Sequence, residues 1–229
     1  MIDVIITIDG PTASGKSSIA KALAQRLNFY YLNTGLLYRA VTYTILSRLQ
    51  QKMVHGVEQW LAQATEKDFD FITDLSYEYR NNEPHVIFQH QDITEHLFDA
   101  TLGQYTSIVS LNTMMRNKLL VLQRTIGQKN NIVVDGRDCG SVVFPNADYK
   151  FFLTADLDVR VQRVLLDPKR NADANDLAKI KADLQERDQR DRERAVAPLV
   201  VPDGAMVIDS SAMTFEQTID LFLKYIQKV

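Results

Sequence analysis

The chain has 229 residues, of which 45% are hydrophobic and 24% charged, and its formal net charge is −3. This balance excludes a wholly disordered chain and supplies enough apolar residues for one globular core. It also argues against a general nucleic-acid binder, although clustered arginines can still form a positive cleft. The single cysteine, Cys139, excludes an intrachain disulfide and a cysteine cluster for zinc, and it favours a reduced, cytoplasmic protein.

Strands and helices are predicted to alternate along most of the chain. Apolar β-branched runs predict strands, and apolar residues at helical spacing predict helices. In chain order, the predicted elements are strand 4–8, helix 16–27, strand 29–32, helix 36–50, a mostly helical segment 101–128, strands 132–134 and 149–153, helices 157–166 and 177–195, strand 206–208 and helix 215–226. This alternation implies an α/β fold around a mainly parallel sheet.

Residues 66–97 interrupt the alternation. Their aromatic and β-branched residues come in short runs, and Asn81-Asn82-Glu83-Pro84 is typical of a turn. The segment therefore predicts a small antiparallel sheet inserted into the α/β chain.

Membrane and export signals are not expected. The first apolar run is short, lacks a basic leader and contains Asp3 and Asp9. No apolar run approaches the roughly 18 to 20 residues of a membrane span.

The segment GPTASGKS matches the phosphate-binding pattern GxxxxGK[ST] between a predicted strand and a predicted helix. Its glycines let several backbone N–H groups converge on phosphate oxygens, and the helix adds its positive end. Lys16 would reach the β- and γ-phosphates, and the Ser17 hydroxyl can ligate Mg²⁺. The motif indicates a nucleoside triphosphate but does not define the reaction. The predicted phosphate-binding residues are Gly10, Pro11, Thr12, Ala13, Ser14, Gly15, Lys16, Ser17 and Ser18.

Other classes of P-loop protein fit less well. A GTPase needs an NKxD-type element, but the only Asn-Lys pair is followed two positions later by Leu120. Motor and transporter ATPases usually have longer chains and a hydrophobic strand ending in an acidic pair, whereas Gly136 follows Asp135 here. Small-molecule kinases remain, and these use arginines to hold two anionic substrates together.

Arginines of this kind occur in three places. Arg39 follows the second strand, and Arg137 lies in Asp-Gly-Arg-Asp at the carboxyl end of a strand, where ligands of open α/β sheets bind. Arg187, Asp191 and Arg194 share one stripe of a predicted helix. Taken alone, a mixed-charge helix is usually a solvated face, and Asp-Gly-Arg-Asp can be a simple turn. Their occurrence together behind a P-loop favours a kinase.

With these motifs in view, the sequence resembles the bacterial-type cytidylate kinases, which are P-loop nucleoside monophosphate kinases. The agreement runs in order through IDGPTASGKS, YLNTGLLYRA, VVDGRDCGSVVFPNADYKFFLTA, ERDQRDRERAVAPL and VIDSSAMTFEQ. Departures are small: Ser18, Asn33 and Cys139 stand where threonine, aspartate and a larger apolar residue are usual. The segment around 167–175 matches poorly.

The resemblance implies an acceptor site for CMP and a donor site for ATP. Asp138 would accept from the cytosine amine and repel the carbonyl of uracil, while Arg39 and Arg137 would hold the acceptor phosphate. The residues implied to bind CMP are Thr34, Arg39, Ser107, Arg116, Arg137, Asp138, Arg187, Asp191 and Arg194. Those implied to act in catalysis are Lys16, Arg137, Arg187 and Arg194.

The resemblance also implies a domain plan. One P-loop kinase domain, residues 1–229, would have a three-layer fold with a five-stranded sheet. Residues 36–115 would form the monophosphate-binding region and carry the inserted sheet, and 156–175 a short lid with Arg160, Arg163 and Arg170. We expect a cytoplasmic monomer of pyrimidine nucleotide metabolism that uses Mg²⁺ with ATP, acts on CMP and dCMP, and binds neither nucleic acid nor membrane.

The expected mechanism is direct in-line transfer. Because the attacking phosphate oxygen is already ionised near pH 7, no general base is needed, and no histidine is assigned a role. His55, His85, His90 and His96 are interpreted as surface or structural, and Cys139 as a packing residue.

Two alternatives stay open from the sequence. The chain could be a kinase for another monophosphate, such as UMP or AMP, on the same fold. It could also be a regulatory module that binds a nucleotide without turnover. Activity on a panel of monophosphates would distinguish a kinase for CMP from one for UMP or AMP. ADP release measured with and without CMP would distinguish an enzyme from a module that only binds a nucleotide.

Overall fold

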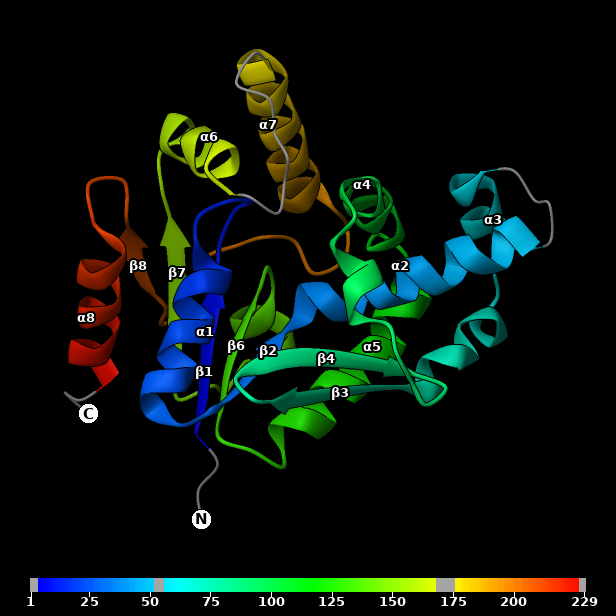
Figure 1. The fold of residues 1–229 in the computed structure, drawn as a ribbon, viewed down its shortest axis with the longest axis horizontal. Helices are drawn as coiled ribbons and strands as arrows, with labels where there is room; N and C mark the ends of the chain where they lie inside the picture. The colour runs from blue at the N-terminus through cyan, green and yellow to red at the C-terminus, as the bar shows by residue number, and fades with distance from the viewer. Residues whose placement is uncertain (1–3, 52–55, 168–175, 227–229) are drawn as a thin grey trace. The chain divides into compact units, whose positions relative to one another are not determined.

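The computed structural model describes residues 4–51, 56–167 and 176–226. The chain divides into two compact units (Figure 1). Unit 1 combines residues 1–32 with 129–229, and unit 2 comprises residues 33–128. Unit 2 is therefore a single continuous insertion between the two segments of unit 1. None of the helices described in either unit is long and apolar enough to cross a membrane.

Unit 1 is built on a five-stranded sheet with the order β2-β6-β1-β7-β8. Strand β1 pairs in parallel with β6 and β7, and β7 pairs in parallel with β8. The strands are β1 (Ile5–Asp9), β2 (Tyr30–Asn33), β6 (Ile132–Gly136), β7 (Tyr149–Thr154) and β8 (Met206–Asp209). The helices are α1 (Lys16–Leu27), α6 (Leu157–Leu165), α7 (Leu177–Glu193) and α8 (Phe215–Ile226), with a short π-helical turn η3 (Cys139–Val143).

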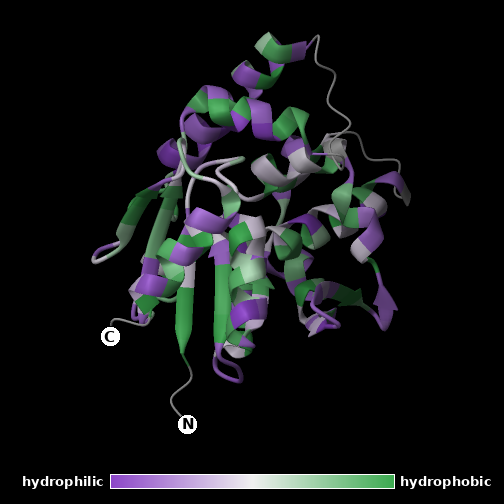
Figure 2. Ribbon diagram, turned by 60° about the vertical axis from the view of Figure 1, so that its left-hand side comes forward, coloured by the Kyte–Doolittle hydropathy of each residue, from purple (hydrophilic) through white to green (hydrophobic). Residues whose placement is uncertain are grey.

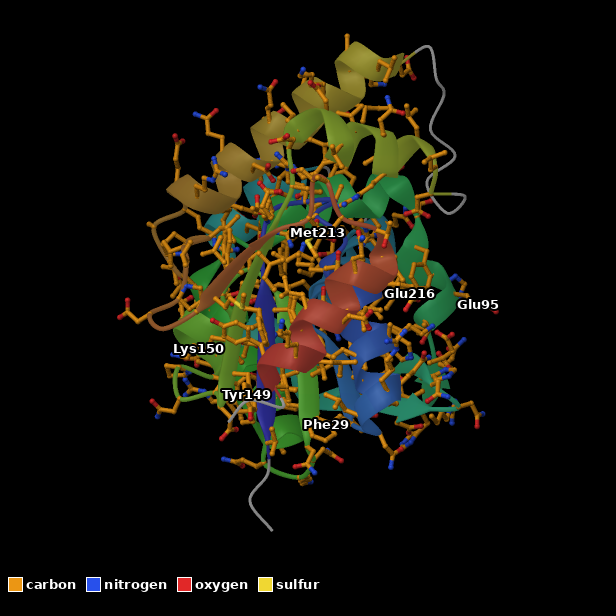
Figure 3. All side chains as sticks on the ribbon, turned by 90° about the vertical axis from the view of Figure 1, so that its left-hand side faces the viewer. Phe29, Glu95, Tyr149, Lys150, Met213 and Glu216 are labelled. Carbon is orange, nitrogen blue, oxygen red and sulfur yellow. The ribbon has the colours of Figure 1, made fainter. Side chains whose placement is uncertain are left out.

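Apolar strands form the core of unit 1. Every residue of β6 and most of β1 are buried, as expected for β-branched runs covered on both faces of a parallel sheet. Figure 2 shows these hydrophobic strands between helices that turn hydrophilic residues outward. Helix α8 covers one face, and the rings of Phe151 and Phe222 lie with centroids 4.4 Å apart. In Figure 3, α8 is in front and Tyr149 lies on β7, where its hydroxyl donates to the carbonyl of Ile226 over 3.1 Å.

Unit 2 combines helices with a three-stranded antiparallel sheet of order β3-β4-β5. The helices are α2 (Thr34–Gln51), α3 (Val57–Gln63), α4 (Ala100–Val109) and α5 (Thr113–Gly127), and the strands are β3 (Leu75–Arg80), β4 (Glu83–Phe88) and β5 (Gln91–Asp92). Two 3₁₀ segments, η1 (Glu66–Asp74) and η2 (Thr94–Phe98), flank the sheet. Asn81 and Asn82 form the two-residue hairpin turn with φ of 54° and 61°, the conformation that asparagine tolerates best among side-chain-bearing residues.

The α/β class, the mainly parallel sheet and the inserted antiparallel sheet are confirmed, but two boundaries differ. Residues 66–74 are helical rather than strand, because Thr65 and Asp68 form a capping box that starts a helical turn. The segment 101–128, predicted to be mostly helical, forms two helices, because Asn112 caps the second one by accepting from the backbone N–H of Met115 over 3.0 Å.

Candidate functional site

The P-loop follows β1 in unit 1 and requires glycine at two positions. A Cβ on Gly10 would lie 2.0 Å from the carbonyl oxygen of Leu153 in β7, so no side chain fits there. Gly15 has φ of 90° and precedes α1 without a side-chain cap. The first amides of α1 are therefore directed at the loop without a capping side chain, which is the arrangement that binds phosphate.

Lys16 is the first residue of α1 and is buried. Its Nζ donates to the carbonyl of Pro11 across the loop over 2.9 Å. Burial lowers the pKa of Lys16 well below its usual value, and the charge of Arg137 adds to this effect, while Asp135 opposes it. An ammonium held in such surroundings is poorly solvated, so an anionic phosphate would be strongly attracted to it.

Ser17 and Asp135 place oxygen ligands together beside Lys16. The Ser17 hydroxyl donates to one oxygen of Asp135 over 2.6 Å, and the Tyr31 hydroxyl donates to the other over 2.8 Å. Burial raises the pKa of Asp135, and Lys16 is the largest opposing influence. Hydroxyl and carboxylate oxygens are ligands that Mg²⁺ accepts alongside the phosphates of a nucleotide. These residues therefore fit a divalent cation delivered with a triphosphate.

Asp9, the last residue of β1, holds the turn that follows the Asp-Gly-Arg-Asp motif. Its two carboxylate oxygens accept from the backbone N–H groups of Cys139 over 2.8 Å and Gly140 over 2.7 Å. Gly140 also packs closely, since a Cβ there would lie 2.7 Å from the hydroxyl of Thr7. Burial raises the pKa of Asp9 to about 6 in spite of the two hydrogen bonds.

This raised pKa predicts a measurable pH dependence. Folded Asp9 keeps its proton to a higher pH than in the unfolded chain, so its contribution to stability is lost as pH rises from about 4 towards 7. Asp9→Asn removes this loss. The free energy of unfolding of Asp9→Asn relative to the parent is expected to increase by about 2 kcal/mol over that range. Urea unfolding at several pH values measures it, with the exposed Asp203→Asn as control, and a constant difference would contradict the assignment.

Arg137 is held by three partners in unit 1, one of which is the carbonyl of Gly136, which accepts from its Nη1 over 3.3 Å. Its Nε donates to Asp191 on α7 over 2.7 Å, and its Nη2 donates to the hydroxyl of Thr12 over 3.0 Å. Arg137 and Asp191 form an ion pair, and burial disfavours the charged form of each. Their mutual attraction outweighs the effect of burial, so the pKa of Arg137 is raised and the pKa of Asp191 is lowered. The guanidinium is therefore a fixed positive charge beside the P-loop.

Three more charged residues predicted for the site are Asp138, which follows β6, Arg187 on α7 and Arg194 just after α7. Asp138 and Arg194 are both buried and form an ion pair with 3.6 Å between Oδ1 and Nη2. Arg194 also donates to the carbonyl of Ala197. Arg187 is half-buried, and its charge contributes to the lowered pKa values of both Lys16 and Asp191. The structure thus places Lys16, Arg137, Asp138, Arg187, Asp191 and Arg194 in one unit, linked by contacts and charge.

The arginines predicted for the lid have protein partners. Arg160 on α6 is buried, forms an ion pair with Asp188 and donates to the carbonyl of Thr12 over 3.1 Å. Arg163 donates to the carbonyl of Ser14 over 2.8 Å, and burial lowers its pKa. Both arginines therefore lie against the P-loop, and their contact with ATP stays a prediction. Arg170 lies outside the described residues.

Four further predicted residues belong to unit 2. Arg39 on α2 donates to the carbonyls of Leu97 over 2.8 Å and Asp99 over 3.1 Å. Arg116 on α5 is buried, donates to the carbonyl of Ser110 over 3.1 Å and lies over the ring of Tyr38. Thr34 begins α2 and Ser107 lies on α4, both buried. Since unit 1 and unit 2 are described separately, the binding of CMP by these residues stays a prediction.

Sequence reasoning did not assign roles to four acidic or aromatic residues of this region: Asp9, Tyr31, Asp135 and Asp188. Asp9 and Asp135 each lie near the carboxyl end of a buried apolar strand, where ligands of parallel sheets bind. A carboxylate at that position could have identified both as candidate site residues. Asp188 adjoins Arg187, but its contact with Arg160 joins residues 28 positions apart, and no local pattern reveals it.

The described histidines and the cysteine lie in surface or structural settings, and His90 is exposed. His85 contacts Asp92 over 2.7 Å, and His96 stacks on Tyr43 with centroids 5.3 Å apart, both within unit 2. Cys139 is fully buried, as expected of a packing residue. His55 lies outside the described residues.

Comparison with known proteins gives a consistent answer over nearly the whole chain. The model of a family described as cytidylate kinase matches residues 6–228. Cytidylate kinase of Thermotoga maritima is 37% identical over 97% of this chain and 96% of its own length. The cytidylate kinases of Bordetella pertussis and Acholeplasma laidlawii are 38% and 33% identical, covering 96% and 97% of this chain and 94% of their own lengths.

Among solved structures, an uncharacterized protein from Eubacterium ventriosum is similar in fold. It superimposes with a TM-score of 0.50 over 99% of each chain at 15% identity. At this identity the similarity concerns the fold alone.

Proposed function

Because the chain belongs to the cytidylate kinase family, a family of phosphotransferases, we propose that it transfers the γ-phosphoryl group of ATP to CMP and to dCMP. Its place would be in cytoplasmic pyrimidine nucleotide metabolism, with the protein acting as a monomer. The observation that supports this best is the chain of contacts from Thr12 in the P-loop through Arg137 to Asp191, which brings a triphosphate-binding loop and a half-buried, fixed arginine together.

The donor site would be the P-loop. The backbone amides that follow Gly15, together with Lys16, would hold the β- and γ-phosphates. Ser17 and Asp135 would hold Mg²⁺ with the nucleotide, and Tyr31 would orient the carboxylate. The metal would supply positive charge that offsets the negative charge of the triphosphate.

The acceptor site would take its charge from the arginines. Arg137 would hold the acceptor phosphate, and Asp191 would fix the guanidinium and offer oxygens to the ribose hydroxyls. Asp138 would accept from the cytosine amine, with Arg194 beside it. In unit 2, Arg39 would contribute to phosphate binding, and Ser107 and Arg116 to the pyrimidine edge. Thr34 would also contact the nucleotide.

The reaction would be an in-line displacement in which electrostatics provides most of the acceleration. Two anions must approach, so Lys16, Arg137, Arg187 and Arg194 would neutralise the charge that develops on the transferring group. The acceptor oxygen is already ionised near neutral pH, so no side chain has to remove a proton. The lid expected at 156–175, of which 168–175 lie outside the described residues, would close over ATP and exclude water.

The proposal predicts that ADP release from ATP and Mg²⁺ depends on the acceptor. CMP and dCMP are expected to stimulate release at least about a hundredfold over ATP alone, since enzyme acceleration far exceeds this factor. UMP and AMP are expected to be poorer acceptors. A coupled ADP assay with the four monophosphates measures this, with EDTA as a control for the metal. Equal release with and without any monophosphate would indicate a nucleotide-binding module, and a preference for UMP or AMP another kinase.

A further inference from the structure

Thr12 in the P-loop uses each of its polar groups on a different partner in unit 1. Its backbone N–H donates to Asp188 over 3.0 Å, and its carbonyl accepts from Arg160 over 3.1 Å. Its hydroxyl accepts from Nη2 of Arg137 over 3.0 Å. Thr12 is 3% exposed, so these bonds replace solvent rather than compete with it.

The backbone contacts fix where the hydroxyl lies. Asp188 and Arg160 are themselves an ion pair, and both are buried. Because one member binds the N–H and the other the carbonyl of Thr12, the peptide groups on both sides of this residue are held. The position of the Thr12 Cα–Cβ bond is therefore fixed, and the β-branched shape of the side chain further restricts its χ1 angle.

The hydroxyl of Thr12 contacts Arg137, the residue proposed to bind the acceptor phosphate, although Thr12 belongs to the loop proposed to bind ATP. Arg137 has two other partners: Asp191 accepts from Nε over 2.7 Å, and the carbonyl of Gly136 accepts from Nη1 over the longer distance of 3.3 Å. The Thr12 hydroxyl is an acceptor for a charged donor, a class of hydrogen bond that is stronger than a neutral one. The hydroxyl is the partner of Nη2, so it helps to fix the orientation of the guanidinium plane.

We propose that Thr12 is a positioning residue that orients Arg137 for the acceptor phosphate, although its place in the P-loop suggests a donor-phosphate role. This inference rests on the proposed function, because it takes Arg137 as the ligand of the acceptor phosphate. The loop then serves both substrates, since the hydroxyl at this position connects the donor loop to the acceptor arginine.

The test compares Thr12→Val, which keeps the branched shape and loses the acceptor, with Thr12→Ser, which keeps the acceptor. Thr12→Val is expected to weaken CMP binding roughly tenfold, the size expected for one hydrogen bond to a charged group. ATP affinity is expected to change by a clearly smaller factor. Thr12→Ser is expected to recover most of the CMP affinity lost in Thr12→Val. Calorimetry with CMP and with ATP in the absence of turnover measures both affinities.

A double-mutant cycle with Arg137→Ala separates positioning from a general effect on the loop. If the hydroxyl acts through Arg137, adding Thr12→Val to Arg137→Ala should weaken CMP binding by no more than about twofold. Full additivity, or a loss of ATP affinity as large as that of CMP, would overturn the inference. If Thr12→Val does not fold, as judged by circular dichroism, Thr12→Ala replaces it in the same cycle.

The failure of the proposed function would look different. If Arg137→Ala alone leaves CMP binding unchanged, Arg137 is not the ligand of the acceptor phosphate, and the premise fails. If Arg137→Ala weakens CMP binding but Thr12→Val does not, the premise holds and only the positioning role fails.

Discussion

Lys16→Met is expected to lower turnover at least about a hundredfold, because it removes the positive charge that stabilises the transferring phosphoryl group. Methionine retains an unbranched apolar chain, so the buried space beside Pro11 stays filled. Since burial disfavours the charged form of Lys16, the variant should unfold at the same temperature as the parent or higher.

The measurement combines steady-state rates with thermal unfolding. Lys16→Arg is the matched control, since it keeps a charge but changes its shape and position. Turnover of Lys16→Met within a few-fold of the parent would contradict the role of the P-loop in catalysis. A large fall in both turnover and unfolding temperature would instead show that Lys16 is needed for the fold.

Asp138→Ala is expected to reduce the use of CMP far more than the use of UMP. A carboxylate that accepts from the cytosine amine repels the uracil carbonyl. Its removal therefore weakens the binding of CMP and removes a repulsion that disfavours UMP. The loss with CMP should be about 1–3 kcal/mol in transition-state binding, whereas UMP should lose little or improve. ATP affinity should barely change, because the expected effect is confined to the base.

The measured quantity is the ratio of kcat/KM for CMP over that for UMP in the parent and the variants. Arg137→Ala is the control, because it should weaken both monophosphates alike through their shared phosphate. An unchanged ratio in Asp138→Ala would assign Asp138 a structural role, for which its ion pair with Arg194 offers the basis.

The sequence predicted the elements that depend on local patterns. The P-loop, the parallel strands and the Asp-Gly-Arg-Asp motif at the end of β6 follow from runs of a few residues, and the structure has them at those positions. The start of the small sheet was misplaced because the aromatic residues of 66–74 suit a strand, whereas the Thr65 capping box favours a helical turn. Local propensity alone could not decide between the two.

Long-range contacts of the candidate site could not be predicted. Asp9 reaches the amides of Cys139 and Gly140 across 130 and 131 residues of sequence, and Thr12 reaches Asp188 across 176. The contacts of Asp9 form because parallel strands bring their carboxyl ends together, and which amides it meets depends on register and on the turn that follows. The contact of Thr12 depends instead on how helix α7 packs against the P-loop. These are the contacts that convert a set of charged residues into a positioned site.

The insertion of unit 2 between β2 and β6 has a consequence for how the protein is made. The partners of β1 in the sheet are β6 and β7, and Ile5 pairs with Ile132, 127 residues later. At a synthesis rate of about 5–20 residues per second, β1 emerges from the ribosome roughly 6–25 seconds before its first partner, β6, emerges. Its apolar edge must be shielded throughout that interval, so the nascent chain is most open to aggregation or chaperone capture until β6 has emerged.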